Sequence, residues 1–130
     1  MIDRATKWIE ACPIVDITAE TVATTFYENW ICRFGQPLKL TSDRGRQFES
    51  DIFKTLMQRM GIQKNRTTAY HPQANGIIER CHRTLKCALT ARLNGQNWSQ
   101  ELPTVLLGLR AAIKEDIGHS SAELLYGQTI

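Results

Sequence analysis

Two carboxylates, Asp43 and Glu79, have the residue types and the sequence surroundings that metal-dependent phosphoryl transfer needs. Asp43 follows a segment predicted to be a strand, and functional groups of α/β proteins collect where strands end. Glu79 falls in the first turn of a predicted helix, behind a glycine-containing loop. Mg²⁺ prefers oxygen ligands, and a pair of such ions can activate an attacking hydroxyl and stabilise the leaving oxygen. The two residues therefore indicate a magnesium or manganese site, with ordinary solvated surface carboxylates as the alternative.

The residues after Glu79 add positive charge to the same side of the predicted helix. Arg83 and Lys86 follow Glu79 at intervals of four and three residues, so all three share one helix stripe. Their cations could hold DNA phosphates beside the metal ions. The alternative is a solvated helix face on which Glu79 and Arg83 form a weak ion pair.

The segment before this helix, residues 67–76, is predicted to be a loop because proline and glycine interrupt it. It carries His71, Gln73 and Asn75, whose side chains can reach phosphates and base edges. The loop is therefore a candidate DNA contact. An ordinary connection from a strand to a helix is the alternative.

Composition places few limits on function. The chain has 130 residues, 42% hydrophobic and 22% charged, which is ordinary for a single globular domain. Its net charge of +3 and pI near 8.8 mildly favour polyanionic partners such as DNA. No apolar stretch is long enough to span a membrane, and no targeting signal is visible, so we expect a nuclear or cytoplasmic protein. The cysteines lack metal-binding or redox spacing and are expected to be reduced thiols; they are Cys12, Cys32, Cys81 and Cys87.

Apolar spacing and turn residues predict strands that alternate with helices. Thr18 and either Ser50 or Asp51 are expected helix caps, and Gly35 and Gly61 are expected to end helices. This order predicts one α/β domain with a mixed sheet flanked by helices. The expected elements are two short strands around a turn within residues 2–15, helices at 18–34 and 51–60, strands at 38–41 and 62–66, a helix at 77–93, a helix opened by Ser99 that runs to about Ile113 with Pro103 in its first turn, and a last helix at 121–126.

Several segments together resemble the integrase catalytic core of gypsy-type LTR retrotransposons and, more distantly, of retroviruses. The resemblance implies a ribonuclease H-like fold and a site of three carboxylates that uses Mg²⁺ or Mn²⁺. It also implies 3′-end processing and strand transfer of element DNA into target DNA, by cores that associate into homo-oligomers. The matching segments are residues 3–8, 18–23, 41–50, 67–76, 77–83, 106–110 and 121–127, in order along nearly the whole chain.

The resemblance assigns roles to individual residues. Asp43 matches the second carboxylate of the family and Glu79 the third, with the family's thirty-five-residue gap between them. Arg83 and Lys86 match helix positions that contact the ends of element DNA. The loop from His71 to Gly76 matches the mobile loop of the active site.

The first carboxylate of the family has no counterpart in the chain. Asp3 lies near the expected place, but the segment that residues 3–8 match follows the strand that carries the first catalytic Asp. Asp3 is therefore expected to be a polar residue at a strand end or turn. We expect a partial core, residues 1–130, that lacks the central strand and is inactive as it stands. A non-catalytic nucleic-acid-binding or oligomerising module remains the alternative, as does another ribonuclease H-like nuclease or transposase.

Overall fold

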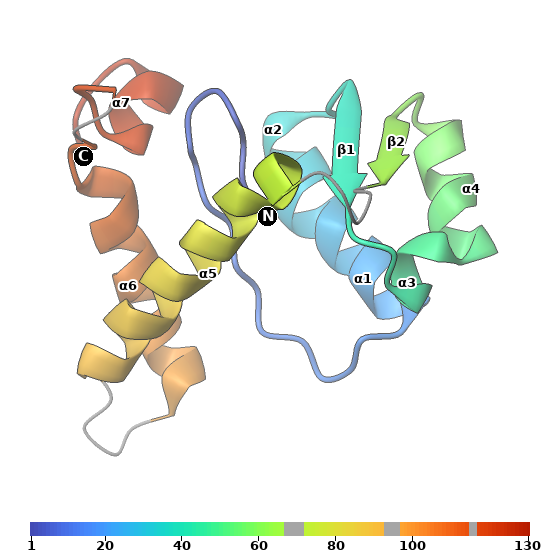
Figure 1. Ribbon diagram of the computed structural model, residues 1–130, viewed down its shortest axis with the longest axis horizontal. Coiled ribbons are helices and arrows are strands. Elements are labelled where there is room, and N and C mark those ends of the chain that lie inside the picture. The colour runs from blue at the N-terminus through green and yellow to red at the C-terminus, as the bar shows by residue number, and fades with distance from the viewer. Residues whose placement is uncertain (67–71, 93–96, 115–116) are drawn as a thin grey trace. The chain divides into compact units, whose positions relative to one another are not determined.

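Figure 1 shows the computed structural model of the chain, which describes residues 1–66, 72–92, 97–114 and 117–130. The chain divides into two compact units. The first, here called the terminal unit, comprises Met1–Ala11 and Gly76–Ile130. The second, here called the middle unit, comprises Cys12–Asn75. Within the described ranges, no helix is both long enough and apolar enough to cross a membrane.

The middle unit begins with the helix that the sequence predicts after Thr18. The Thr18 Oγ1 accepts a backbone N–H of the first turn at 3.3 Å, which caps helix α1, Ala19–Phe26. The helix continues through a π-helical turn, Tyr27–Ile31, into α2, Cys32–Phe34. Gly35 then adopts φ 85°, a left-handed conformation that glycine reaches without steric cost. The predicted start and end of this helical segment are both confirmed.

The rest of the middle unit is a two-stranded parallel sheet with short helices between its strands. Strand β1, Lys39–Ser42, pairs with β2, Gln63–Arg66, in parallel register. Between them lie α3, Arg46–Glu49, and α4, Asp51–Arg59. The Ser50 hydroxyl caps α4, as one of the two predicted caps. The buried apolar residues of this unit are Ala23, Phe26, Ile31, Phe53, Met57 and Ile62.

The sheet differs from the expected mixed sheet. The strands that the structure describes form the parallel pair alone, and the hairpin at the start of the chain contributes a single antiparallel bridge, Ile2–Ile9. The two strands expected within residues 2–15 are reduced to this bridge, and residues 10–15 form no ladder. Pro13 offers no backbone N–H to a partner strand, which is consistent with irregular structure there.

The terminal unit packs two long helices and a hairpin around a small apolar core. Helix α5, Pro72–Arg92, and helix α6, Trp98–Ala111, lie side by side, and α7, Ser121–Tyr126, follows α6 (Figure 1). The core residues are Ile9, Leu102 and Leu106, with Ile2, Ala11, Cys81, Leu85, Leu89 and Leu109 packed against them. The N-terminal hairpin is thereby joined to helices that lie far along the sequence.

Two helix starts differ from the predictions. Helix α5 begins at Pro72, so residues 72–76 are helical where the sequence predicted a loop. Proline lacks an N–H and has a fixed φ, which suits the first position of a helix. Helix α6 is capped by Asn97, whose side chain accepts the N–H of Ser99 at 3.1 Å, so Ser99 is not the cap. This earlier start places Pro103 in the second turn instead of the first.

The guanidinium of Arg110 on α6 fixes the end of the hairpin. Its Nε and Nη2 atoms both donate to the carbonyl oxygen of Ile9, at 2.9 and 2.6 Å. It also pairs with Glu10 at 3.0 Å and lies over the Trp8 ring, 4.3 Å from the ring centroid. Trp8 in turn donates from Nε1 to Glu10 and meets the Tyr126 ring edge-on. One buried cation thus satisfies a backbone carbonyl and a buried carboxylate together.

Candidate functional site

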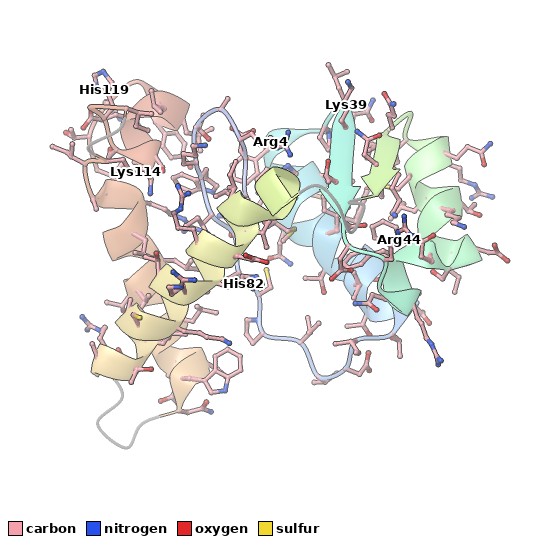
Figure 2. The ribbon with its side chains drawn as sticks, viewed as in Figure 1. Arg4, Lys39, Arg44, His82, Lys114 and His119 are labelled. Atoms are coloured by element: carbon pink, nitrogen blue, oxygen red, sulfur yellow. The ribbon has the colours of Figure 1, made fainter. Side chains whose placement is uncertain are left out.

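Asp43 follows the last residue of β1 and is exposed to solvent. Its Oδ1 atom accepts the backbone N–H of Gly45 at 2.8 Å. No other bond to the Asp43 side chain occurs within the described residues, so Oδ2 is open to a ligand. Arg44, the next residue along the chain, lies in the turn from β1 to α3, at the opposite end of β1 from Lys39 (Figure 2). A hydrogen bond thus fixes one carboxylate oxygen while the other faces solvent.

The turn after Asp43 is crowded around Gly45. A Cβ atom at this position would lie 3.0 Å from Asp43 Oδ1 and 2.9 Å from Gln47 Oε1. The first distance is tighter than most real Cβ contacts and the second is shorter than real Cβ atoms show, so a side chain at position 45 would have to displace the end of Gln47 or Asp43. The backbone of Gly45, with φ −56° and ψ 146°, would accept any residue. The glycine at this position therefore leaves space for the two polar side chains and does not serve backbone freedom.

Glu79 lies on the outer side of α5. Its side chain is exposed, whereas Cys81, Leu85 and Leu89 on the same helix pack against the core. At about 100° per residue, Cys81 and Leu85 lie roughly 160° and 120° around the helix from Glu79, and Leu89 lies roughly 80° from it, so the packed side is turned away from Glu79. Within the part of the chain that the structure describes, Glu79 has no ion-pair partner, so the weak pair with Arg83 does not form.

The cations predicted to share the stripe of Glu79 are present on the same exposed face. Arg83 and Lys86 are both exposed, as the helical spacing predicts. Arg80 is also exposed, and so is His82, which Figure 2 labels on α5. The outer face of α5 therefore carries positive charge around a single carboxylate, Glu79.

The two candidate carboxylates belong to different units, Asp43 to the middle unit and Glu79 to the terminal unit. No group of three His, Cys, Asp or Glu side chains suited to a metal ion occurs among the described residues. The donors nevertheless fit a hard divalent cation, since each carboxylate is exposed and has oxygen atoms free of protein bonds.

Asp3 has a structural role. Its Oδ2 atom accepts the backbone N–H of Thr6 at 2.9 Å and the Thr6 hydroxyl at 2.7 Å. These bonds close the hairpin turn, where Lys7 has φ 61°. The interpretation of Asp3 as a turn residue is therefore the one that the structure supports.

The loop residues proposed to contact DNA are described only in part. His71 lies outside the described residues. Gln73 and Asn75 belong to the first turns of α5, and their side chains lie outside the description. The role of these three residues remains a prediction.

Two residues beside the functional elements were not found by sequence reasoning. Gln47 lies four residues after Asp43, and the Asp-x-Gly-x-Gln spacing is the only sequence signal that connects them. Arg110 lies within an apolar helical segment, where an isolated cation indicates a buried partner. Neither partner could be named without the structure, because both contacts depend on how the chain folds back.

Sequence comparisons match the chain to one protein-family model and to retroviral polyproteins. A family model described as the TnsB C-terminal domain matches residues 12–95. The chain is 36% identical over 129 residues to the Gag-Pol polyprotein of Koala retrovirus, covering 97% of this chain and 8% of that protein. It is 34% identical over 131 residues to the Gag-Pol polyprotein of Walleye dermal sarcoma virus, covering 98% of this chain and 7% of that protein. The chain thus spans less than a tenth of these relatives.

Solved structures of integrase cores match this chain in fold. The catalytic core domain of BIV integrase matches with TM-score 0.80 and 28% identity, covering 95% of this chain and 80% of that chain. The HTLV-2 integrase catalytic core domain in complex with magnesium matches with TM-score 0.78 and 19% identity, covering 94% and 79%. The fold is therefore the α/β, ribonuclease H-like fold of integrase cores. The family model over residues 12–95 shows that the chain belongs to the TnsB C-terminal domain family, and the polyprotein relatives and solved structures show that within it the chain is similar to retroviral integrase catalytic cores.

Proposed function

We propose that this chain is the catalytic part of an enzyme that joins retroelement DNA ends to target DNA with Mg²⁺ or Mn²⁺. The observation that carries the proposal is the state of Asp43 at the end of β1. The residue is exposed, one of its oxygens is fixed by Gly45, and the other is bonded to none of the described residues. A carboxylate oriented in this way suits a divalent cation. The relative solved with magnesium supports the choice of metal.

Each proposed site residue has a separate task. Asp43 and Glu79 would hold the metal, which when bound would help to deprotonate an attacking hydroxyl and neutralise charge on the leaving oxygen. Arg83 and Lys86, exposed beside Glu79 on α5, would bind DNA phosphates and position the strand. His71, Gln73 and Asn75 would add contacts from the start of α5.

The resemblance to integrase cores implies a third carboxylate, which the 130 residues do not supply. Two carboxylates bind a hard cation less tightly than three, and in-line phosphoryl transfer depends on accurate placement of both reacting oxygens. We therefore expect the 130-residue chain to join DNA ends weakly or not at all. An open frame upstream of Met1, encoding a strand that ends in Asp, would supply the missing ligand.

The proposal is tested with a labelled double-stranded oligonucleotide that carries an element end, a supercoiled target and Mn²⁺. The 130-residue chain is compared with the same chain extended by the upstream frame. Joining by the extended chain, lost in Asp43→Asn and in Glu79→Gln, is the expected result. Robust joining by the 130 residues alone would overturn the requirement for a third carboxylate. Joining that survives either substitution would overturn the assigned site.

A non-catalytic DNA-binding module is the second candidate, and the exposed cations of α5 favour it. Arg80, Arg83 and Lys86 are solvent-exposed, and none is bonded to an acidic residue within the described part of the chain. Binding through phosphates alone would be strongly salt-dependent and indifferent to metal. Salt-dependent DNA binding without Mn²⁺-dependent joining by the extended chain would select this function.

We also propose that the chain assembles as a homo-oligomer. The names of two solved relatives refer to a trimeric core and to an intasome, which supports a homo-oligomer for this chain. Sedimentation equilibrium of the 130-residue chain tests this assembly, and a monomer at tens of micromolar would contradict it.

We also assign the chain to the gypsy-type retrotransposon branch, because the residues at positions 41–50 and 67–76 resemble that branch.

A further inference from the structure

The side chain of Gln47 is a polar group beside the proposed metal ligand that has no hydrogen-bond partner among the described residues. Gln47 is half-buried, and its carboxamide forms no hydrogen bond with any described residue. Its backbone is held in place, because its carbonyl oxygen accepts the Ser50 hydroxyl at 3.0 Å. A half-buried amide that bonds to none of the described residues has its donor and its acceptor available to water or a ligand.

The same amide is close to Asp43. A Cβ on Gly45 would lie 2.9 Å from Gln47 Oε1, 3.0 Å from Gln47 Nε2 and 3.0 Å from Asp43 Oδ1. The carboxamide and the carboxylate therefore border the same small space, which exists because residue 45 has no side chain. Asp43 Oδ1 is fixed there by the Gly45 N–H at 2.8 Å.

Hydrated cations need partners of this kind. Mg²⁺ dehydrates reluctantly and keeps several waters when one or two carboxylates hold it. Groups that bind those waters orient the direct ligands, and their loss usually weakens metal affinity. A glutamine amide can accept a hydrogen bond from a metal-bound water without adding charge.

We propose that Gln47 is a positioning residue of the metal centre, which binds a water in the hydration shell of the cation held by Asp43. Gly45 is required in this arrangement because it leaves the space in which both polar groups approach that water. The inference rests on the proposed function, since it needs a cation at Asp43. It adds a residue that the assignment of the carboxylates does not contain.

The test measures Mn²⁺ affinity and needs no catalysis. Free Mn²⁺ is followed by electron paramagnetic resonance during titration of the 130-residue chain. Gln47→Met keeps the volume of the side chain and removes its hydrogen bonds, and we expect affinity about 10-fold weaker. Gln47→Glu keeps the acceptor oxygen and the length, so its affinity should equal or exceed that of the unchanged chain. Gln58→Ala, at an exposed position on α4, is the matched control and should leave affinity unchanged.

Gly45→Ala provides a second, independent variant. Its backbone angles suit alanine, so the chain should fold, while the added methyl displaces Gln47, Asp43 or both. We expect weaker Mn²⁺ binding with an unchanged circular dichroism spectrum.

The outcomes separate this inference from the proposed function. If Asp43→Asn abolishes Mn²⁺ binding while Gln47→Met binds like the unchanged chain, the role of Gln47 is wrong and the metal site stands. If Asp43→Asn leaves Mn²⁺ binding intact, the metal site at Asp43 is wrong and the inference fails with it. Loss of affinity in Gln47→Met and retention in Gln47→Glu support the proposal.

Discussion

Arg110→Met tests how the N-terminal hairpin is held in the terminal unit. Arg110 is the cation for Glu10, and their side chains are only 15% and 5% exposed. Its guanidinium also donates two hydrogen bonds to the Ile9 carbonyl and covers the Trp8 ring. The substitution keeps an apolar stem of similar length and removes all of these contacts.

The expected loss of stability is large because the buried Glu10 carboxylate would lose its ion pair with Arg110. Removing one partner of a buried ion pair costs about 3–5 kcal/mol, which is a substantial part of the roughly 5–15 kcal/mol that stabilises a small protein. With an m-value of about 2 kcal/mol per molar urea, the unfolding midpoint should fall by about 1.5–2.5 M. Replacing Glu10 by leucine in the same chain should recover part of the loss, since no buried carboxylate then remains without Arg110.

The assay is urea unfolding of the 130-residue chain, followed by circular dichroism and by hydrogen exchange at the amides that close the hairpin. The backbone N–H of Asp3 donates to the carbonyl oxygen of Trp8 at 3.0 Å, and the backbone N–H of Glu10 donates to the carbonyl oxygen of Met1 at 2.9 Å. Exchange at these two amides therefore reports on the hairpin. Arg92→Met is the control. Arg92 pairs with Glu101 at 3.1 Å, but its side chain is 52% exposed, and such pairs contribute about 0–1 kcal/mol. Equal losses for Arg110→Met and Arg92→Met would refute the reasoning.

Three further predictions concern other parts of the chain. Lys86→Ala should weaken DNA binding and lower the slope of log affinity against log salt by about 1. Lys54→Ala on α4 should change this slope less. Equal slopes for the two variants in fluorescence anisotropy would contradict the role of α5. Ser120→Ala removes the cap that accepts the first-turn N–H of α7 at 3.1 Å, and should cost about 1 kcal/mol in thermal unfolding; an unchanged melting temperature would count against it. Burial raises the pKa of the Cys81 thiol, so iodoacetamide at pH 8 should alkylate Cys81 more slowly than the exposed Cys87, with the difference narrowing as pH rises; equal rates by mass spectrometry would show that Cys81 is accessible.

Local signals in the sequence predicted most helix boundaries of the middle unit. Thr18 and Ser50 act as caps, and Gly35 and Gly61 end helical segments with positive φ. These features depend on hydrogen bonds and dihedral angles within a few residues, so the sequence is sufficient to find them. The exposed stripe of α5 was predictable for the same reason, since helical spacing alone relates its members.

Features that depend on competing local choices were predicted less well. Pro72 could end a loop or begin a helix, and only the folded chain selects the helix. Asn97 and Ser99 are both good caps, and their order along the chain does not decide between them. The contacts of Arg110 join residues about a hundred positions apart, so no local pattern contains them.

The chemical assignment came from the order of motifs along the chain. Asp43 and Glu79 are ordinary carboxylates by composition, and their roles rest on resemblance and on their exposed positions. The structure added what the sequence could not supply, namely that Gly45 fixes one oxygen of Asp43 and that Asp3 is occupied in a turn. Both depend on side-chain geometry within a turn.

The most direct test of the central claim is Mn²⁺ binding to the 130-residue chain and to Asp43→Asn, Glu79→Gln and the double variant. If both carboxylates serve one metal centre, each single substitution should weaken binding about 10-fold or more, and the double variant should be little weaker than either. Asp16→Asn, at an exposed carboxylate in the same unit as Asp43, should bind like the unchanged chain. Unchanged binding in either single variant, or losses that simply add in the double variant, would contradict a shared centre.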